Sequence, residues 1–226
     1  MENKKLVLCG AGGHAKSIYS SLKELNNFKI IGYCDNEKKE FFDLKYLGND
    51  NEILKLKKDG INNIFVCIGS IGNPKIRKKL YLKMKENGFS MPSIIDRTAV
   101  VDARMIGSNV FIGKNSVVNS NASIGDMAII NSGSVIEHDT IIENFVHIAP
   151  GVVICGNCKV GENSHIGAGS VVIQGITIGK DCIIGAGSVV VKDIPDGVVA
   201  FGNPCRVVRK NEKSSDNSWS WCKSQW

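Results

Sequence analysis

Three of the chain's four histidines lie in one long stretch of regularly spaced aliphatic residues. His138 and His147 are nine residues apart, and His165 follows eighteen residues after His147. A neutral imidazole near pH 7 is suited to take a proton from a reacting group. His138 lies between Glu137 and Asp139, and Glu137 stands where the surrounding pattern usually has Gly or Asn. Because functional sites tend to break local sequence rules, the segment around His138 is the first candidate site.

The elements that must position these histidines follow from a period of six residues. From Ile94 to Val190, every sixth residue is a β-branched aliphatic, at seventeen consecutive positions. This period is neither 3.6 nor 2 and is typical of a parallel β-helix built from hexapeptides. Three hexapeptides form one triangular coil, so residues one coil apart stack at one strand spacing, about 4.8 Å. We expect the aliphatic residues to point inward, and the Gly or Asn after each of them, such as Gly107 or Gly125, to take the positive φ of a sharp corner.

The spacing of the histidines then predicts where they lie on the prism. Nine residues are half a coil, so His138 and His147 should lie on different sides. His165 should stack on His147 along the same edge. A site that uses both His138 and His147 therefore needs a neighbouring prism.

The first ninety residues have a different pattern. Apolar strands are expected at 5–9, 28–34 and 64–68, alternating with helices that run to residue 25, over 52–58 and over 74–87. This order predicts a small parallel α/β sheet. The loop Gly10-Ala11-Gly12-Gly13-His14-Ala15 follows the first strand, and backbone amides at such a helix N-terminus attract phosphate. With Asp35 about twenty residues further on, the loop also fits a dinucleotide fingerprint, so NAD binding is an alternative, although only about half of a doubly wound fold precedes the repeat.

Three segments together resemble bacterial sugar acetyltransferases of the hexapeptide-repeat superfamily: GAGGHAKSI, HDTIIENFVHIAPGVVICG and IGAGSVVVKDIPDGVVAFGNP. The resemblance covers residues 4 to about 209 and includes sialic-acid O-acetyltransferases and N-acetyltransferases of nucleotide-linked amino sugars. It implies a small N-terminal Rossmann-like βαβαβ domain followed by a left-handed parallel β-helix. We place a nucleotide-sugar-binding domain at 1–92, the acyltransferase β-helix at 93–209 and a tail at 210–226. The resemblance also implies acetyl-CoA as co-substrate, no metal, and a homotrimer with shared active sites.

The same resemblance assigns roles to individual positions. His138 is the general base for direct acetyl transfer, Asp139, or alternatively Glu137, orients it, and the backbone N–H of Gly156 stabilises the tetrahedral oxyanion. The implied substrate-binding residues are Gly12, Gly13, His14, Asp35, Asn36, Gly69, Ser70 and Asn131, of which Asn131 fits an ordinary corner residue equally well. The implied cofactor-binding residues are His147, Ala168, Gly169, Ala186, Gly187 and Arg206, of which the small ones fit tight corner packing equally well. Asn36 stands where several relatives carry a second acidic residue, so the resemblance does not identify the nucleobase of the nucleotide.

Several reactions fit this site. N-acetylation of a nucleotide-linked 4-amino-4,6-dideoxy sugar is favoured because both His138 and His147 are present, and O-acetylation of sialic acid is the alternative. A zinc enzyme of the γ-carbonic-anhydrase type would need three converging ligands, and the histidine spacings differ from that pattern. A non-catalytic scaffold would have no need to retain His138 and Asp139.

Composition limits the partners. With 43% hydrophobic and 22% charged residues, the chain has the composition of a soluble globular protein. Its net charge of +6 comes from scattered lysines, which does not favour a nucleic-acid groove. We expect no membrane span and no signal peptide, and hence a cytoplasmic protein whose eight cysteines are free thiols. The polar tail with its three tryptophans is expected either to be disordered or to cap the open end of the β-helix.

Overall fold

The computed structural model describes residues 4–212 and begins with a small parallel sheet. Its strands are β1 (Lys4–Cys9), β2 (Phe28–Cys34) and β3 (Asn63–Val66), in the order β2-β1-β3. The helices α1 (Gly13–Leu25), α2 (Ile53–Leu56) and α3 (Lys75–Glu86) follow the three strands in turn. The predicted alternation of strands and helices is confirmed, although α2 is shorter than expected and β3 ends at Val66.

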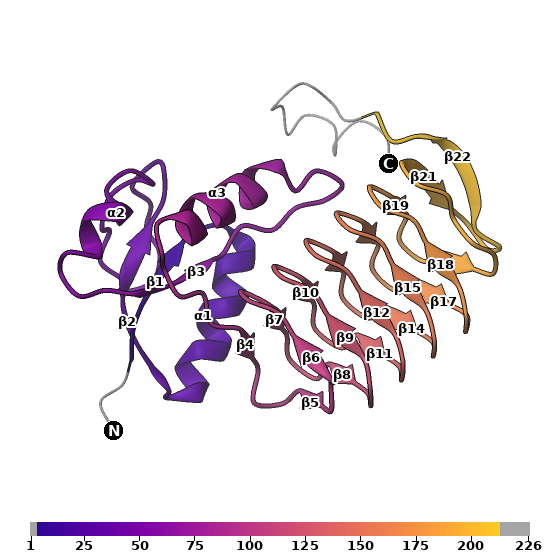
Figure 1. Cartoon of the computed structure of the whole chain (residues 1–226), viewed down its shortest axis with the longest axis horizontal. Helices are drawn as coiled ribbons and strands as arrows, with labels where there is room; N and C mark the ends of the chain where they lie inside the picture. The colour runs from indigo at the N-terminus through magenta and orange to yellow at the C-terminus, as the bar shows by residue number, and fades with distance from the viewer. Residues whose placement is uncertain (1–3, 213–226) are drawn as a thin grey trace.

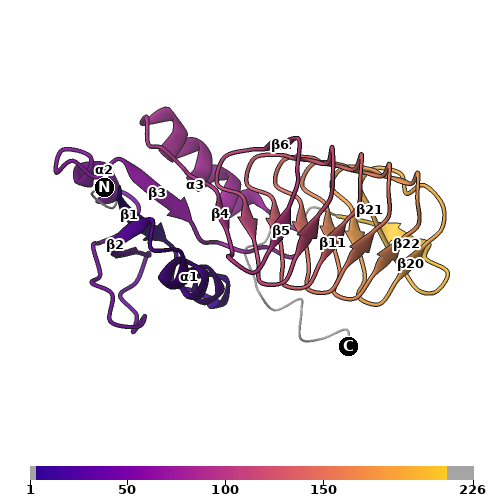
Figure 2. The same cartoon turned by 90° about the horizontal axis from the view of Figure 1, so that it is seen from below.

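The remainder of the described chain is a triangular solenoid of stacked coils (Figure 1). Each side of a coil is a two-residue strand that pairs in parallel with the strand one coil away. Figure 2 shows the coils stacked in one row, with the N-terminal sheet at the end where the solenoid begins. The predicted parallel β-helix is therefore confirmed, and we call its three faces the docking face, the valine face and the mixed face.

The docking face carries the N-terminal domain. Its strands are β4 (Ile94–Ile95), β7 (Phe111–Ile112), β10 (Ile129–Ile130), β13 (His147–Ile148), β16 (His165–Ile166), β19 (Ile183–Ile184), β21 (Val198–Phe201) and β22 (Arg206–Lys210). β22 pairs antiparallel with β21 and ends the described β structure at Lys210, one residue beyond the boundary expected from the sequence. The three tryptophans of the expected tail lie outside the described residues.

The other two faces differ in their outward side chains. The valine face consists of β5 (Val100–Val101), β8 (Val117–Val118), β11 (Val135–Ile136), β14 (Val153–Ile154), β17 (Val171–Val172) and β20 (Val189–Val190). The mixed face consists of β6 (Met105–Ile106), β9 (Ser123–Ile124), β12 (Ile141–Ile142), β15 (Lys159–Val160) and β18 (Thr177–Ile178).

The prism interior is filled by the predicted aliphatic residues, except at its start. From Ile112 to Val190 the residues at the six-residue period are at most 1% exposed. Ile94 and Val100 instead point outward, because Ile95 pairs with Ile112 and Val101 with Val118, so Ile95 and Val101 occupy the interior positions. The sequence prediction was wrong at these two positions because the first coil is one residue shorter, and a shift of one residue turns a strand's side chains to the other face.

The corner glycines do not adopt the conformation that the sequence predicted. Positive φ occurs two residues later than expected, for example at Asn109 (54°) and Asn163 (64°), while Gly107 and Gly161 have no such angle. Glycine is required there for another reason: a Cβ on Gly107 would lie 2.6 Å from the backbone nitrogen of Asp126 in the next coil. These positions are glycine because the next coil approaches closely, and the left-handed residues are chiefly Asn, Asp or Gly.

The N-terminal domain is fixed to the prism along the corner between the mixed face and the docking face. Asn109 at this corner pairs with the edge of β3, accepting a hydrogen bond from Val66 N at 2.8 Å and donating one to Val66 O at 3.2 Å. Further along the corner, two residues of α3 contact the prism. The hydroxyl of Tyr81 donates a hydrogen bond to Oδ2 of Asp126 at 2.7 Å, and Lys78 forms an ion pair with Glu162. In Figure 1, α3 lies beside the ends of the first coils.

Among the described residues, no helix is long and apolar enough to cross a membrane.

Candidate active site

His138 lies at the corner between the valine face and the mixed face, two residues after the end of β11. Its Nδ1 lies 2.8 Å from Oδ2 of Asp139. An ionised carboxylate can only accept, so Nδ1 carries the proton and Nε2 presents a free lone pair. The side chain is 61% exposed, and the hydrogen bond to Asp139 raises the pKa of His138 above its ordinary value. Of the two carboxylates considered from the sequence, Asp139 contacts the ring, whereas Glu137 accepts only from the backbone N–H of His138, at 3.4 Å.

Asp139 is itself held by a residue that the sequence reading missed. Asn121, one coil earlier at the same corner, donates from Nδ2 to Oδ1 of Asp139 at 2.6 Å. This hydrogen bond, followed by that of His138, lowers the pKa of Asp139 and keeps it ionised. The signal was available, because Asn121 precedes Asp139 by one coil and so stacks next to it.

Gly156 lies one coil beyond His138, and the imidazole packs against it. A Cβ on Gly156 would stand 2.6 Å from both Cε1 and Nε2 of His138. Its backbone N–H makes no hydrogen bond among the described residues. The corner therefore places a proton acceptor beside an available backbone donor, the pair of groups that acyl transfer requires.

His147 lies on the docking face, on a different side of the prism from His138, as the spacing predicted. Its Nδ1 lies 2.7 Å from the backbone oxygen of Ser70. Since a carbonyl only accepts, Nδ1 is protonated and Nε2 is an acceptor, which is buried without a partner among the described residues. His165 stacks against His147 with ring centroids 4.9 Å apart, also as predicted. Burial lowers the pKa of His147 to about 4 and that of His165 to about 3.

The glycine loop of the N-terminal domain opens at the start of α1. Gly12 is the N-cap, no side chain caps the helix, and nothing lies within 4 Å of a Cβ built on Gly12 or Gly13. The first amides of α1 therefore have no side-chain cap and face open space, which suits an anion. His14 packs edge-on against Phe111 of the prism, with ring centroids 5.4 Å apart, and burial lowers its pKa to about 3.

Asp35 braces this loop. Its Oδ2 accepts a hydrogen bond from Ala11 N at 2.9 Å, and its Oδ1 pairs with Lys39 at 3.2 Å. Asn36, beside it, is exposed. The structure therefore places Asp35 next to the loop and Asn36 at the surface beyond it.

Loop 69–73 joins the glycine loop to the docking face. A Cβ on Gly69 would lie 3.3 Å from Cβ of His14, and a Cβ on Gly72 would lie 2.3 Å from Cδ1 of Ile183. Together with the hydrogen bond that His147 donates to the Ser70 carbonyl, these contacts place Gly69, Ser70, His14 and His147 in one region. Asn131 lies elsewhere, at a corner between the docking face and the valine face, and its side chain accepts from Ser132 N at 2.9 Å.

The small residues proposed to line the cofactor form an exposed column. Ala168 and Ala186 stack one coil apart, as do Gly169 and Gly187, at the corner between the docking face and the valine face. They lie across the valine face from His138. Arg206 is an exposed residue at the start of β22, and its Nη1 donates to the carbonyl of Cys205 at 3.0 Å.

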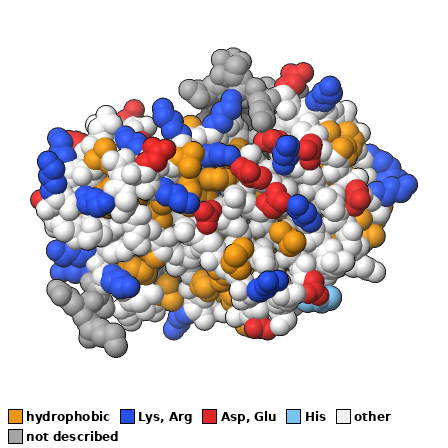
Figure 3. Space-filling view, in the orientation of Figure 1, with side chains coloured by type: hydrophobic (Ala, Val, Ile, Leu, Met, Phe, Trp, Pro, Cys, Tyr) orange, Lys and Arg blue, Asp and Glu red, His pale blue; other side chains and the backbone are white. Residues whose placement is uncertain are grey.

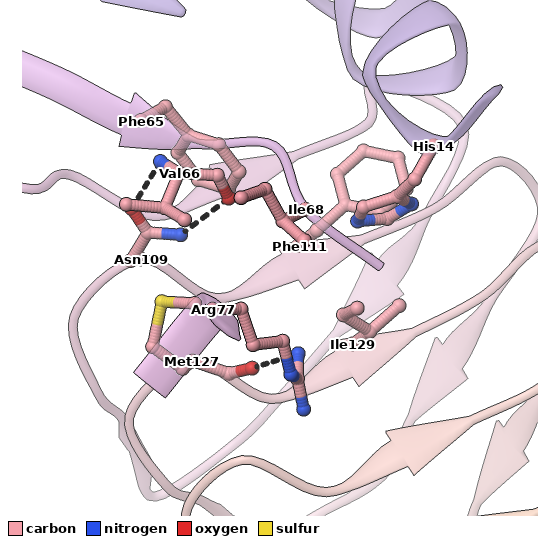
Figure 4. A pocket seen from close by; sticks show the side chains of 9 residues that line it. All are labelled: His14, Phe65, Val66, Ile68, Arg77, Asn109, Phe111, Met127 and Ile129. Carbon is pink, nitrogen blue, oxygen red and sulfur yellow. Dashed lines mark hydrogen bonds between the residues drawn. The ribbon is translucent and has the colours of Figure 1, made fainter. Parts of the chain in front are cut away.

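Arg77 in α3 is a second residue that the sequence alone does not point to, since it stands in a lysine-rich helix of the kind that is usually solvated. Arg77 is 1% exposed, and its guanidinium donates to the backbone oxygens of Met127, at 2.9 Å, and Phe145. Figure 4 shows it next to Met127 in a pocket between the two domains that Ile129 and His14 also line. Burial lowers the pKa of Arg77 to about 9. Met127 and Phe145 occupy left-handed corner positions at which Asn or Asp stands in neighbouring coils, and their side chains pack into the N-terminal core.

Charge is mixed over the face seen in Figure 3, where Lys and Arg side chains alternate with Asp and Glu. Ion pairs in the described chain include Lys78 with Glu162, Lys85 with Asp126, and Lys159 with Glu143. Within residues 4–212, no three side chains of His, Cys, Asp or Glu are grouped to hold a metal ion.

Two family models match the chain. The PglD N-terminal domain matches residues 5–84, and the bacterial transferase hexapeptide (six repeats) matches residues 105–138, 139–174 and 157–192. The fold and these two family models therefore define a hexapeptide-repeat transferase built on a left-handed β-helix.

Solved structures carry the assignment further. Perosamine N-acetyltransferase from Caulobacter crescentus, solved as a histidine-to-asparagine mutant with CoA and GDP-perosamine, is 35% identical, covering 90% of this chain and 96% of that chain with a TM-score of 0.85. The acetyltransferase domain of PglB from Neisseria gonorrhoeae, solved with acetyl coenzyme A, is 32% identical, covering 91% and 100% with a TM-score of 0.85. WeeI from Acinetobacter baumannii, at 24% identity and a TM-score of 0.78, shares the fold. The chain belongs to the bacterial acetyl-CoA-dependent sugar acetyltransferases of the hexapeptide superfamily.

Proposed function

We propose that this enzyme transfers an acetyl group from acetyl-CoA to the amino group of a nucleotide-linked 4-amino-4,6-dideoxy sugar. The observation that carries the reaction is the corner at His138, where Asp139 fixes the ring through Nδ1 and Nε2 faces away with a free lone pair. The sugar amine attacks the thioester carbonyl carbon as Nε2 takes its proton. The oxyanion that forms accepts from Gly156 N–H, the C–S bond breaks, and protonated His138 returns the proton to the departing thiolate.

The nucleotide sugar is proposed to bind in the N-terminal domain. The uncapped amides of α1 at Gly12 and Gly13 suit its phosphates, because a helix N-terminus favours anions. His14, Gly69 and Ser70 line the same region, and Asp35 and Asn36 lie at the end of β2 where the nucleoside would extend. Asn131 is proposed to contact the sugar from the prism.

Acetyl-CoA is proposed to lie along the exposed column of Ala168, Gly169, Ala186 and Gly187, with Arg206 near its nucleotide end. His147 presents an acceptor at Nε2, because Nδ1 donates to Ser70. It therefore suits an amide N–H of the pantetheine arm better than the acetyl carbonyl, which has no hydrogen to donate.

The site requires a second copy of the chain, and we propose a homotrimer. His138 lies at one edge of the valine face and the proposed acetyl-CoA column at the other, so one prism cannot bring them together. The valine face supports such an assembly, because five half-exposed valines form an in-register outward row there: Val117, Val135, Val153, Val171 and Val189. A continuous apolar stripe of this kind marks an interaction surface.

The test is acetyl transfer by the purified chain. Acetyl-CoA is supplied with GDP-perosamine, with other nucleotide-linked amino sugars, or with sialic acid, while free CoA thiol and product mass are followed. We expect turnover with an amino sugar, and we expect His138→Ala to reduce kcat by about 10²- to 10⁴-fold, the usual contribution of a general base. Turnover with sialic acid alone would replace N-acetylation by O-acetylation, and an unaffected His138→Ala variant would remove the base.

A further inference from the structure

The corner that holds the proposed base contains one more ordered contact. Asn121, Asp139 and His138 form a chain of two hydrogen bonds, 2.6 Å from Asn121 Nδ2 to Asp139 Oδ1 and 2.8 Å from Asp139 Oδ2 to His138 Nδ1. Each oxygen of the Asp139 carboxylate therefore has a separate partner. Both Asn121 and Asp139 are in the left-handed conformation, with φ of 62° and 59°, so their side chains project from equivalent corner positions of adjacent coils.

We propose that Asn121 is a positioning residue of the acetyl-transfer reaction, which fixes the Asp139 carboxylate so that its other oxygen holds the His138 ring. The inference rests on the proposed role of His138 as base and adds to it a residue that does not touch the reacting atoms. Without Asn121 the carboxylate, which is 47% exposed, is free to rotate about its side-chain torsions. A rotated Asp139 no longer fixes the ring, so Nε2 leaves the position from which it takes the proton.

A neighbouring corner shows what the same contact does without a base. Asn163 donates to Asp181 at 3.1 Å across one coil, again from a left-handed position, with φ of 64°. Asp181 is preceded by Lys180, where Asp139 is preceded by His138. An Asn stacked on an Asp is therefore part of the architecture of the β-helix. What distinguishes the pair of Asn121 and Asp139 is that Asp139 also holds His138, so that this pair affects the proposed base. Asn163→Gly is the matched control, because it removes the same kind of contact and keeps a residue suited to positive φ.

The charged groups around His138 are few. Asp139 and Glu137 lie on its own turn, and the Cys155 thiol lies at the corresponding corner of the next coil. On the preceding coil, Ser120 next to Asn121 donates to Asp102 at 2.6 Å. Asn121 is neutral, so replacing it with Asp adds one negative charge beside Asp139, while replacing it with Gly changes no charge.

The experiment combines histidine titration by NMR with steady-state kinetics on the full chain. The chain has four histidines, and the pKa values of His14, His147 and His165 are lowered to about 3 to 4 while that of His138 is raised, so the signal that titrates at the highest pH belongs to His138. We expect Asn121→Gly to move the pKa of His138 down toward its ordinary value and Asn121→Asp to move it up, because the first frees Asp139 and the second adds negative charge. We expect kcat to fall about tenfold in Asn121→Gly, as the loss of one hydrogen bond predicts, with little change in KM for acetyl-CoA.

The outcomes separate this inference from the proposed function. Asn163→Gly should leave both the His138 titration and kcat unchanged, and all variants should retain native circular dichroism. An Asn121→Gly enzyme that titrates and turns over like the wild type, while His138→Ala is inactive, overturns the role of Asn121 and leaves the base in place. Equal losses in Asn121→Gly and Asn163→Gly would show a purely architectural contact and also overturn it. An active His138→Ala enzyme would remove the proposed function and this inference together.

Discussion

The imidazole of His138 lies against the backbone of Gly156 in the next coil, so close that a Cβ on Gly156 would stand 2.6 Å from Cε1 and Nε2. Gly156 has no positive φ, and the same position in the preceding and following coils is occupied by Ser120, His138 and Gln174. The β-helix itself therefore does not require glycine at 156. The space beside Gly156 is instead occupied by the His138 ring.

Gly156→Ala should consequently damage activity without damaging the fold. The added methyl group displaces the ring from its position, and a misplacement of about 1 Å can cost about 10²-fold in rate. We expect kcat to fall by that order while the melting temperature stays within a few degrees of wild type. Gln174→Ala, at the equivalent position one coil further on, is the control and should have wild-type kcat. A Gly156→Ala enzyme with normal kcat would show that the ring is not held where the structure places it.

Asp139→Asn should change both the rate and its pH dependence. The base must be unprotonated, so activity falls as pH decreases through the pKa of His138, which Asp139 raises above about 6.5. Without the carboxylate, the acidic limb of the pH–rate profile moves to lower pH. The Asn amide can also donate to Nδ1, which would put the proton on Nε2 and remove the base, so kcat should fall sharply.

Glu137→Gln is the comparison for this experiment. Glu137 contacts the backbone of His138 and contributes only charge to the ring, so its removal should move the acidic limb slightly down and leave kcat nearly unchanged. Equal effects on kcat in the two variants would contradict Asp139 as the orienting carboxylate.

Much of this architecture is predictable because a period of six residues determines which side chains share a face. The stack of His147 on His165 and the separation of His138 from His147 both follow from counting residues per coil. The role of the corner glycines cannot be predicted in this way. Gly107 is glycine because the backbone of the next coil lies close to it, and a local sequence pattern does not show that contact. Arg77 was missed for a similar reason: its lysine-rich helix indicates solvent, and only the docking of α3 on the prism buries that one position.

Arg77→Ala should destabilise the contact between the two domains. The guanidinium is the donor for the buried carbonyls of Met127 and Phe145, and each acceptor left unsatisfied costs about 1–3 kcal/mol, or about 2–6 kcal/mol for the pair. Arg77→Met should cost less than Arg77→Ala, because its longer side chain fills part of the space that Ala leaves as a cavity. Urea unfolding measures both, with the exposed Lys79→Ala on the same helix as control. A loss no greater than that of Lys79→Ala would mean that Arg77 does not hold the domains together.

Acid should weaken the fold through the buried histidines. Burial lowers the pKa values of His14, His147 and His165 to about 3, 4 and 3, below the value of about 6.5 in the unfolded chain. Below pH 6.5 the unfolded chain therefore binds more protons than the folded one, and stability declines as pH falls toward 4, by up to about 1.4 kcal/mol per pH unit for each histidine. His138 has the opposite sign, since its raised pKa favours the folded state at low pH.

His165→Phe isolates this effect. His165 is 8% exposed and its Nδ1 has no partner within the described chain, so an aromatic ring of similar shape keeps the packing and removes one titrating group. The decline of the urea midpoint between pH 6.5 and 4 should be less steep than in the wild type. An identical slope in both proteins would show that His165 does not titrate on unfolding in this range.

Replacing a valine at the centre of the valine face should dissociate the proposed trimer. Val153 lies in the middle of the outward row, and an Asp there would have to be buried without a partner if a second prism covers it, a cost of several kcal/mol. Sedimentation should therefore show a smaller particle for Val153→Asp, with circular dichroism of an intact β-helix and with acetyl transfer lost, because His138 no longer meets the acetyl-CoA column of another copy. Thr177→Asp, an exposed outward position on the mixed face, is the control and should retain the wild-type mass. Because the active site is proposed to need two chains, a Val153→Asp protein that sediments as a monomer and still turns over would contradict the shared site, and one that keeps the wild-type mass would exclude the valine face as the interface.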